Sequence, residues 1–373
     1  MDNFLKNSKS MRESQLAEKL KKYLNYVVQQ GASDLHLSVG DYPIIRLDGE
    51  LYRLDKEELI TKADLENLVE IVLSDMQKKK FQKDRSVDFS LATESGERFR
   101  VNVYYQKEDI SFALRYIPKK IRTLQELGIP EYVYDFVEKP QGLLLVTGPT
   151  GHGKSTTLAA LVDYLNANKR YHIVTIEDPI EYVHDSKQSL VNQREVYDDA
   201  TSFSSALRSA FREDIDVILL GEMRDLDTIS TAITAAETGH LILATLHTND
   251  SIQTIDRIID VFPAHQQNQI RSQLANVLLG VVSQRLVRKI GGGRVPAVEI
   301  LIHNVAIANL IRQKQTHQIN TVMETSLDEG MISINRSLAN LVKQGVVDVK
   351  DAEAFATDVG MFKMLLDSEV IYE

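Results

Sequence analysis

The stretch LLLVTGPTGHGKST, residues 143–156, places an apolar run directly before a glycine-rich turn, a lysine and two hydroxyl side chains. From Gly148 to Ser155 it matches the pattern G-x-x-x-x-G-K-[ST], and the residues that follow predict a helix. Glycines let the backbone turn its N–H groups inward on phosphate oxygens, and the helix N-terminus adds a partial positive charge. The stretch therefore predicts a strand, a phosphate-binding loop and a helix, rather than an ordinary corner that happens to be rich in glycine.

Residues of this loop have separate expected roles in binding ATP and Mg²⁺. Lys154 would reach the β- and γ-phosphates, and Ser155 would ligate Mg²⁺. His152 fills a variable position of the pattern, so no role follows for it. The expected nucleotide-binding residues are Gly148, Pro149, Thr150, Gly151, His152, Gly153, Lys154, Ser155 and Thr156.

Four nearly continuous apolar runs predict an α/β domain around the loop. Helical stretches separate most of them, and this alternation is typical of a parallel sheet covered by helices on both faces. In open α/β sheets, ligands bind beyond the carboxyl ends of the strands. The runs are LLLVT (143–147), HIVTI (172–176), DVILL (216–220) and LILAT (241–245).

Acidic and imidazole groups follow the carboxyl ends of the second, third and fourth runs. We expect Glu222 to hold Mg²⁺, directly or through water, and Glu181 to polarise the attacking water. His247 could sense the γ-phosphate through a hydrogen bond, whereas His240, at the opposite end of its run, could face a neighbouring subunit. Any one of these acids could be merely solvated, but their combination with the loop favours a functional site. The remaining acids at the end of the second run are Glu177 and Asp178.

Arginines could neutralise charge on the γ-phosphate oxygens beyond what the loop lysine supplies. Arg100 and Arg115 alternate with apolar neighbours on two predicted strands, so they could point together at a site in another subunit. A solvated surface arginine is the alternative for each. The other candidates are Arg98, Arg208, Arg212 and Arg224.

Residues before the loop predict a smaller α+β domain. An amphipathic helix at 13–30 is followed by short alternating strands, with one helix inserted at 63–77. Prolines and glycines then mark a candidate hinge. The predicted divisions are an N-terminal domain at 1–117, with a disordered extension at about 1–14, a linker at 118–140, and an ATPase domain at 141–373 that is helical from about Ala264.

Composition restricts the class of protein. The 373 residues carry a net charge of −10, which argues against a nonspecific DNA binder. Because there is no cysteine, disulfides and thiolate metal sites are excluded. No run approaches the roughly 18 apolar residues that span a bilayer. We therefore expect a cytoplasmic protein whose membrane contact is at most peripheral.

Four segments resemble, in order, the motif boxes of the secretion-type hexameric ATPases. They are most similar to the twitching-motility branch, the PilT-type type IV pilus retraction ATPases. The resemblance extends from GASDLHL at Gly31 to AIANLIRQ at 306–313. The segments are GPTGHGKSTT for Walker A, TIEDPIEY for the Asp box, DVILLGEMRD for Walker B and TAAETGHLILATLHT for the His box.

This resemblance implies a PAS-like N-terminal domain joined by a flexible linker to a RecA-like ATPase domain. It also implies a homo-hexameric ring that binds ATP between the two domains and transmits motion to an inner-membrane platform protein at the pilus base. The residues that it assigns are Lys154 and Ser155 for phosphate and Mg²⁺, Glu181 as catalytic base, Glu222 as the Walker B glutamate, His240 and His247 as the His-box histidines, and Arg100 and Arg115 as the arginines that reach the γ-phosphate.

Departures from the retraction pattern leave open which member of the retraction branch this chain is, and whether it drives retraction unaided. Ile215 stands where the family usually has proline, and Ala308 and Gln313 replace charged residues in AIANLIRQ. The tail after 328 looks more like the PilU-type accessory retraction ATPases, which would act beside a paralogous retraction ATPase. A RecA-like nucleic-acid translocase is the third hypothesis, against which the net charge and the absence of tryptophan count.

Overall fold

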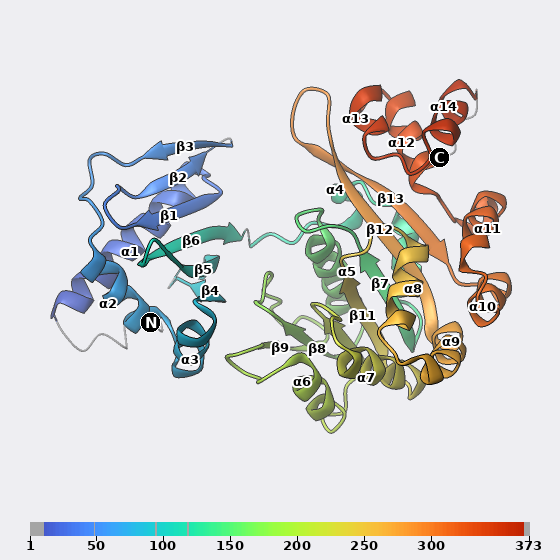
Figure 1. Cartoon of the computed structure of the whole chain (residues 1–373), viewed down its shortest axis with the longest axis horizontal. Helices are drawn as coiled ribbons and strands as arrows, with labels where there is room; N and C mark the ends of the chain where they lie inside the picture. Colours follow the sequence, from blue (N-terminus) through green and yellow to red (C-terminus); the bar gives the residue numbers. More distant parts are fainter. Residues whose placement is uncertain (1–10, 48, 94, 118, 369–373) are drawn as a thin grey trace. The chain divides into compact units, whose positions relative to one another are not determined.

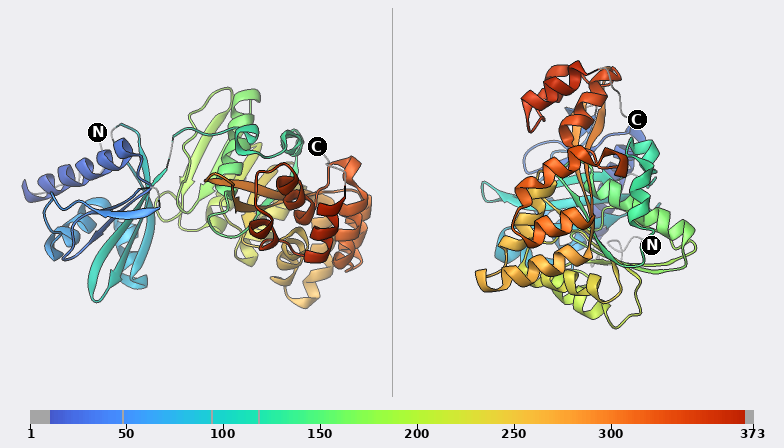
Figure 2. Two further views of the ribbon diagram at one scale, coloured as in Figure 1. Left: turned by 90° about the horizontal axis from the view of Figure 1, so that it is seen from above. Right: turned by 90° about the vertical axis from the view of Figure 1, so that its right-hand side faces the viewer.

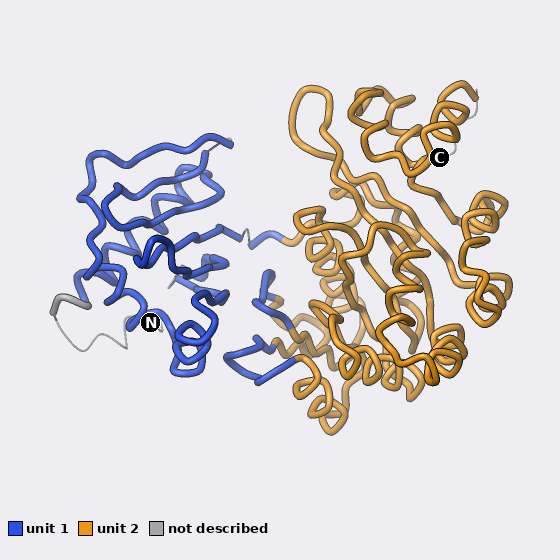
Figure 3. The backbone as a smooth tube through the Cα atoms, in the orientation of Figure 1, with its two compact units in different colours: residues 1–120, 177–183, 194–202 blue, residues 121–176, 184–193, 203–373 orange. Residues whose placement is uncertain are grey.

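The computed structural model describes residues 11–47, 49–93, 95–117 and 119–368, which form two compact units (Figures 1 and 3). Unit 1 contains the described residues up to Lys120 together with the short segments 177–183 and 194–202. Unit 2 contains the remainder from Ile121 onward.

Unit 1 is an α+β unit built on an antiparallel sheet. Its helices are α1 (Met11–Gln30), α2 (Lys62–Val72) and α3 (Asp75–Asp84), and its strands are β1 (Asp34–Ser38), β2 (Ile44–Leu47), β3 (Glu50–Arg53), β4 (Ser86–Ala92), β5 (Arg98–Gln106) and β6 (Asp109–Ile117). Within the described residues the sheet has six strands in the order β3-β2-β1-β6-β5-β4. The smaller α+β domain expected from the sequence is therefore present.

Register places the core of unit 1 on one face of this sheet. Phe89, Val101 and Leu114 stand opposite one another on β4, β5 and β6, and all three are buried. Since side chains alternate across a strand, one residue in two points to this face. The helices α1 and α2 contact each other and the sheet, and they contribute Leu24 and Leu65 to the same core (Figure 2).

Two expectations for unit 1 were wrong. The single helix at 63–77 is two helices, because Leu73 is extended and Ser74 begins α3 with a capping box that Gln77 completes. Residues 11–14 belong to α1 rather than to a disordered extension, and residues 1–10 lie outside the described residues.

Unit 2 is centred on a mixed sheet. Its strands are β7 (Gly142–Thr147), β8 (His172–Glu177), β9 (Leu190–Glu195), β10 (Val217–Leu220), β11 (Leu241–Leu246), β12 (Leu278–Arg288) and β13 (Arg294–Ile302). Across the described part of the chain the order is β13-β12-β7-β11-β10-β8-β9. The pairs β12–β7, β7–β11, β11–β10 and β10–β8 are parallel, and β12–β13 is antiparallel.

Helices cover this sheet because its central strands are apolar on both faces. They are α4 (Leu124–Leu127), η2 (Glu131–Phe136), α5 (Lys154–Asn168), α6 (Phe203–Ala210), α7 (Leu226–Glu237), α8 (Ser251–Asp260), α9 (Ala264–Val277), α10 (Val305–Arg312), η3 (Thr316–Gln318), α11 (Ile319–Thr325), η4 (Leu327–Glu329), α12 (Ile334–Lys343), α13 (Val349–Glu353) and α14 (Val359–Asp367). Leu144 and Val146 pack with Leu161 of α5. Leu143 and Leu145 project to the opposite face, where α7 contacts β7 and β11.

The expectation of a mostly helical segment from Ala264 was wrong for residues 278–302. These residues form the β12–β13 hairpin, which the C-terminal helices α12–α14 cover around Val287 and Ala297 (Figure 1). A pattern analysis misses β12 because three buried polar residues, Ser283, Gln284 and Arg285, interrupt its apolar run, so the strand is neither continuously apolar nor alternating.

Gly280 provides a test of this packing. A Cβ atom there would lie 2.4 Å from the Phe136 ring and 2.6 Å from the carbonyl oxygen of Leu301. We predict that Gly280→Ala lowers the free energy of unfolding by about 1–3 kcal/mol, measured by urea denaturation followed by circular dichroism. The control is Gly360→Ala, at an exposed helical position where a Cβ atom would lie 3.3 Å from the Asp358 side chain alone, and this exposed side chain can move aside. Equal stability of both variants would contradict the close approach.

Candidate functional site

Residues 148–153 form a loop between the end of β7 and the start of α5. Gly148 has a φ of 141° and lies against β12, where a Cβ atom would be only 2.5 Å from the carbonyl oxygen of Gln284. Gly151 and Gly153 also have positive φ, and Gly153 is the N-cap of α5. Glycine is therefore required by conformation at all three positions, and at Gly148 by space as well. Pro149, Thr150 and His152 complete the loop, and Ser155 and Thr156 lie in the first turn of α5.

Lys154 is buried, with 7% of its surface exposed. Its Nζ donates hydrogen bonds to the carbonyl oxygens of Gly148, at 2.8 Å, and Pro149, at 3.0 Å. It also lies 3.4 Å from Nδ1 of His247. The lysine thus lies over its own loop at the N-terminus of α5, where the helix dipole attracts anions.

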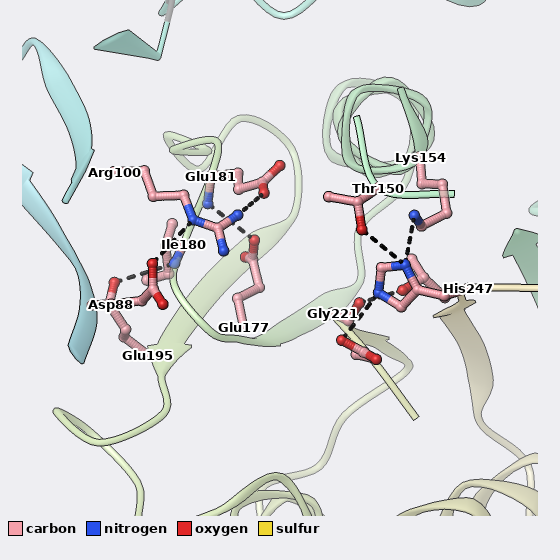
Figure 4. Close-up of polar contacts among 12 residues, drawn as sticks. Asp88, Arg100, Thr150, Lys154, Glu177, Ile180, Glu181, Glu195, Gly221 and His247 are labelled. Carbon is pink, nitrogen blue, oxygen red and sulfur yellow. Dashed lines mark hydrogen bonds and ion pairs between the residues drawn. The ribbon is translucent and has the colours of Figure 1, made fainter. Parts of the chain in front are cut away.

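A chain of polar contacts joins the loop to the ends of β10 and β11 (Figure 4). His247 follows β11, and its Nδ1 lies 3.4 Å from Oγ1 of Thr150. Its Nε2 lies 3.3 Å from a carboxylate oxygen of Glu222, which follows β10. The other oxygen of Glu222 is 2.5 Å from Nε of Arg224. The structure therefore brings together the loop, Glu222, His247 and Arg224, all at the carboxyl ends of adjacent strands.

Glu222 is held in its anionic form. Burial by itself raises the pKa of Glu222, but the hydrogen bond from Arg224 and the interaction with His247 outweigh burial and hold the pKa below its ordinary value. The side chain is 16% exposed. A carboxylate that stays ionised here suits a hard divalent cation.

These groups fit a nucleotide with Mg²⁺. The backbone turn and the buried ammonium of Lys154 suit phosphate oxygens, which they can bind with N–H donors and positive charge. Mg²⁺ in nucleotide sites takes one or two protein oxygens and completes its shell with phosphates and water. The hydroxyl of Ser155 and the carboxylate of Glu222 are the protein oxygens that the sequence assigned to it. Within the described residues, no group of three or more His, Asp or Glu could hold a metal by itself.

Unit 1 carries a second group of expected site residues. Arg100 and Arg115 stand directly opposite each other in the β5–β6 register, as their alternation on neighbouring strands suggested. Arg100 donates to a carboxylate oxygen of Glu181 at 3.0 Å, and its Nε lies 3.8 Å from Asp88 (Figure 4). The backbone N–H of Glu181 donates to the Glu177 carboxylate at 3.3 Å. Asp178 lies between these two acids, directly after β8.

Two neighbouring arginines of unit 1 have different surroundings. Arg115 is 71% exposed and pairs with Asp34 at 2.9 Å. Arg98 lies 3.9 Å from the buried carboxylate of Glu195 and donates to Oγ of Ser90 at 2.6 Å. Burial lowers the pKa of Arg98. Arg98 is therefore part of the packing of unit 1, whereas Arg115 keeps much of its surface available.

Three expected motif residues lie away from the loop within unit 2. His240 precedes β11, at the end opposite His247, and its Nδ1 lies 3.2 Å from the carbonyl oxygen of Ala235. Arg208 contacts Ser204 one helical turn away on α6, and Arg212 contacts the backbone of Arg208. These contacts are local.

Sequence reasoning missed the contribution of β12 to the loop. Gln284 approaches Gly148, and the N–H of Leu286 donates to Nδ1 of His152 at 2.9 Å. One feature of the sequence could have revealed β12. The glycine triplet at 291–293 stands between two apolar runs, a pattern typical of a β-hairpin.

Residues 9–293 match the type II/IV secretion system protein family. The type IV pilus retraction ATPase PilT of Pseudomonas aeruginosa is 50% identical over 329 residues, which are 88% of this chain and 95% of that protein. The type IV pilus ATPase PilU of the same organism is 36% identical over 346 residues, 92% of this chain and 90% of that protein.

The solved structures include a similar protein. The crystal structure of the pilus retraction motor PilT with bound ADP has a TM-score of 0.84 and 46% identity, and the match covers 92% of this chain and 98% of that one. Among the described residues of this chain, no helix is both long and apolar enough to cross a membrane.

Glu222 gives a pH-dependent prediction. Because its pKa is lowered in the folded state, its contribution to stability is present above its unfolded pKa, about 4.3, and is lost as pH falls through the folded value. We predict that Glu222→Gln lowers the free energy of unfolding by on the order of 1 kcal/mol near neutral pH, with a smaller difference from wild type below about pH 4. Urea denaturation across pH measures this, with the exposed Glu131→Gln as control. A difference that is constant with pH would contradict the assigned ion pairs.

Proposed function

Since the chain belongs to the type II/IV secretion system protein family, we propose that it is an ATPase that powers type IV pilus retraction in twitching motility. The observation that carries this proposal is the 50% identity with a pilus retraction ATPase over nearly the full length of both chains. The phosphate loop, with its buried lysine and its contacts to the ends of β10 and β11, supports the ATPase chemistry.

In this proposal the loop binds the phosphates of ATP. Lys154 would exchange the carbonyl oxygens of its own loop for β- and γ-phosphate oxygens, while N–H groups at the start of α5 bind the same phosphates. Ser155 and Glu222 would hold Mg²⁺, which neutralises charge on the β- and γ-oxygens. His247 contacts Lys154, Thr150 and Glu222, so it can register whether a γ-phosphate is bound.

Glu181 is the proposed base that polarises the attacking water. In the single chain Arg100 contacts one oxygen of this carboxylate, and the second oxygen can accept a hydrogen bond from water. In the ring Arg100 would leave this contact for the site of the neighbouring subunit. Arg100 and Arg115 are 39% and 71% exposed, so both can present positive charge to a neighbouring copy of the chain. An arginine that reaches the γ-phosphate from another subunit adds about 10³–10⁵ in rate.

The proposed working form is a homo-hexamer in the cytoplasm, peripherally associated with the inner membrane at the pilus base. Hydrolysis would rotate the N-terminal domain at 1–117 against the ATPase domain at 141–373 about the linker at 118–140, and an inner-membrane platform protein would receive that motion. Assembly with a paralogous retraction ATPase is compatible with this proposal.

The accessory role and the nucleic-acid role are less well supported. Identity is 50% with the retraction ATPase PilT against 36% with PilU, which favours the principal retraction role. The net charge of −10 gives no basis for strong phosphate-backbone binding.

Cells lacking the gene test the proposal. We expect excess surface pili and loss of twitching, both restored by the wild-type gene but not by Lys154→Ala, because this lysine supplies the buried positive charge of the loop. Purified Lys154→Ala should lose Mg²⁺-dependent ATP hydrolysis, whereas Lys83→Ala, at an exposed position of α3, should keep it. Cells without surface pili would instead indicate that the protein powers pilus extension. Stimulation of ATP hydrolysis by DNA would favour a nucleic-acid translocase.

Mixed rings test whether arginines act between subunits. We predict that Arg100→Ala and Glu181→Ala are each inactive alone, and that mixtures recover ATPase activity. Recovery follows because a site with Glu181 from one subunit and Arg100 from the next is then intact. The measurement is steady-state hydrolysis across mixing ratios after re-assembly. Absence of recovery at every ratio would place both residues in the same site of one subunit.

A further inference from the structure

His152 connects the phosphate loop to strand β12. The parallel pairing of β7 with β12 ends at Thr147 opposite Ser283, and beyond this point the loop replaces the strand along that edge of β12. There the backbone N–H of Leu286 donates a hydrogen bond to Nδ1 of His152 at 2.9 Å. The imidazole thus supplies the acceptor that a continuing strand would otherwise provide.

Other contacts place the same loop along two residues of β12. Gly148 lies against the carbonyl oxygen of Gln284, as described above. A Cβ atom at Gly153 would lie 3.6 Å from Nε2 of Gln284 and 3.8 Å from the Leu286 side chain. Three loop residues, Gly148, His152 and Gly153, therefore lie against Gln284 or Leu286 of β12, and His152 does so through a side-chain hydrogen bond.

The neighbouring strand β13 does not supply the acceptor for Leu286. This residue stands opposite Pro296 on β13, and its N–H is directed to His152 instead. Loss of the imidazole acceptor would leave the part-buried N–H of Leu286 without a hydrogen-bond partner, and an unpaired buried donor raises the free energy of the fold. The hydrogen bond between Leu286 and His152 thus joins the loop to β12, and no acceptor on β13 takes its place.

The surroundings of the imidazole keep it neutral, as an acceptor must be. The Phe355 ring, after α13, contacts it edge-on at 6.1 Å between centroids. Among the described residues, the charged groups that act on its pKa are cations, Arg285 on β12, Arg294 on β13 and Lys154 on α5. Burial first, and then these cations, lower the pKa of His152. A protonated Nδ1 could not accept the Leu286 N–H.

We propose that His152 is a positioning residue for nucleotide binding, which holds the phosphate loop on β12 by accepting the hydrogen bond from Leu286. The inference rests on the proposed ATPase function, since the loop must bind phosphates for its position to matter. His152 acts through the loop backbone, whose N–H groups it keeps in place for the phosphate oxygens.

Two substitutions at this position separate the hydrogen bond from the bulk of the ring. His152→Leu keeps an apolar side chain but has no acceptor, whereas His152→Asn places Oδ1 where it can accept the same N–H and cannot be protonated. Titration of the full chain with fluorescently labelled ADP and Mg²⁺ measures affinity. We expect about tenfold weaker binding for His152→Leu, and affinity close to wild type for His152→Asn.

The pH profile adds a readout that a merely structural role would not move. Because the pKa of His152 is lowered, wild-type affinity should hold at neutral pH and fall only as pH drops below the ordinary histidine pKa of about 6.5. His152→Asn should lose that part of the dependence, while the exposed His265→Asn should keep it. The difference between the variants isolates His152 from other groups that titrate near the loop.

The outcomes distinguish the inference from the proposed function. A wild-type chain that binds ADP, with His152→Leu binding equally tightly, overturns the positioning role alone. Full wild-type pH dependence in His152→Asn overturns that role as well. A wild-type chain that binds no nucleotide overturns the proposed function, and the inference with it. If His152→Leu fails to fold, the comparison of His152→Asn with wild type across pH still shows whether His152 positions the loop.

Discussion

The burial of β7 on both faces is the constraint on which the rest of unit 2 depends. Residues 143–146 have no exposed surface, and β7 lies between β12 and β11 in the sheet. Since this strand has no solvated face, the chain can place polar groups only at the strand ends. The pairings from β12 through β7, β11 and β10 to β8 are all parallel, so the carboxyl ends of these strands lie along one edge. The phosphate loop, Glu222 and His247 meet at that edge for this reason.

Charges at this edge compensate one another. The ammonium of Lys154 is buried, which would be unfavourable without the two carbonyl oxygens that it contacts. Glu222 is stabilised as a carboxylate by Arg224 and His247. In unit 1, the opposite charges of Arg100 and Glu181 compensate each other in the same way, through a hydrogen-bonded ion pair. A nucleotide with its metal would exchange several of these internal partners for phosphate and Mg²⁺, so binding can change contacts in the protein without leaving a charge unpaired.

Much of the fold and of the candidate site could be predicted from the sequence because the informative signals were local. The strands of unit 1, the four apolar strands of unit 2 and the loop pattern each occupy a short window with its own periodicity. The β12–β13 hairpin could not be recognised in the same way, because the buried polar residues Ser283, Gln284 and Arg285 interrupt the apolar run of β12, which is neither continuous nor alternating. The break between α2 and α3 at Leu73 and Ser74 was also missed, since the capping box that begins α3 lies inside one continuous apolar pattern.

The sequence alone determined the kind of site, since glycines, a lysine and a hydroxyl at this spacing, between an apolar strand and a helix, suit phosphates. Only the tertiary structure decided which side chains hold that loop. Leu286 is 134 residues from His152, and no local pattern links a backbone N–H on a later strand to a variable loop position. The same holds for the ion pair of Arg100 with Glu181, 81 residues apart. Such contacts depend on strand order and register, which arise from the packing of the whole chain rather than from any one segment.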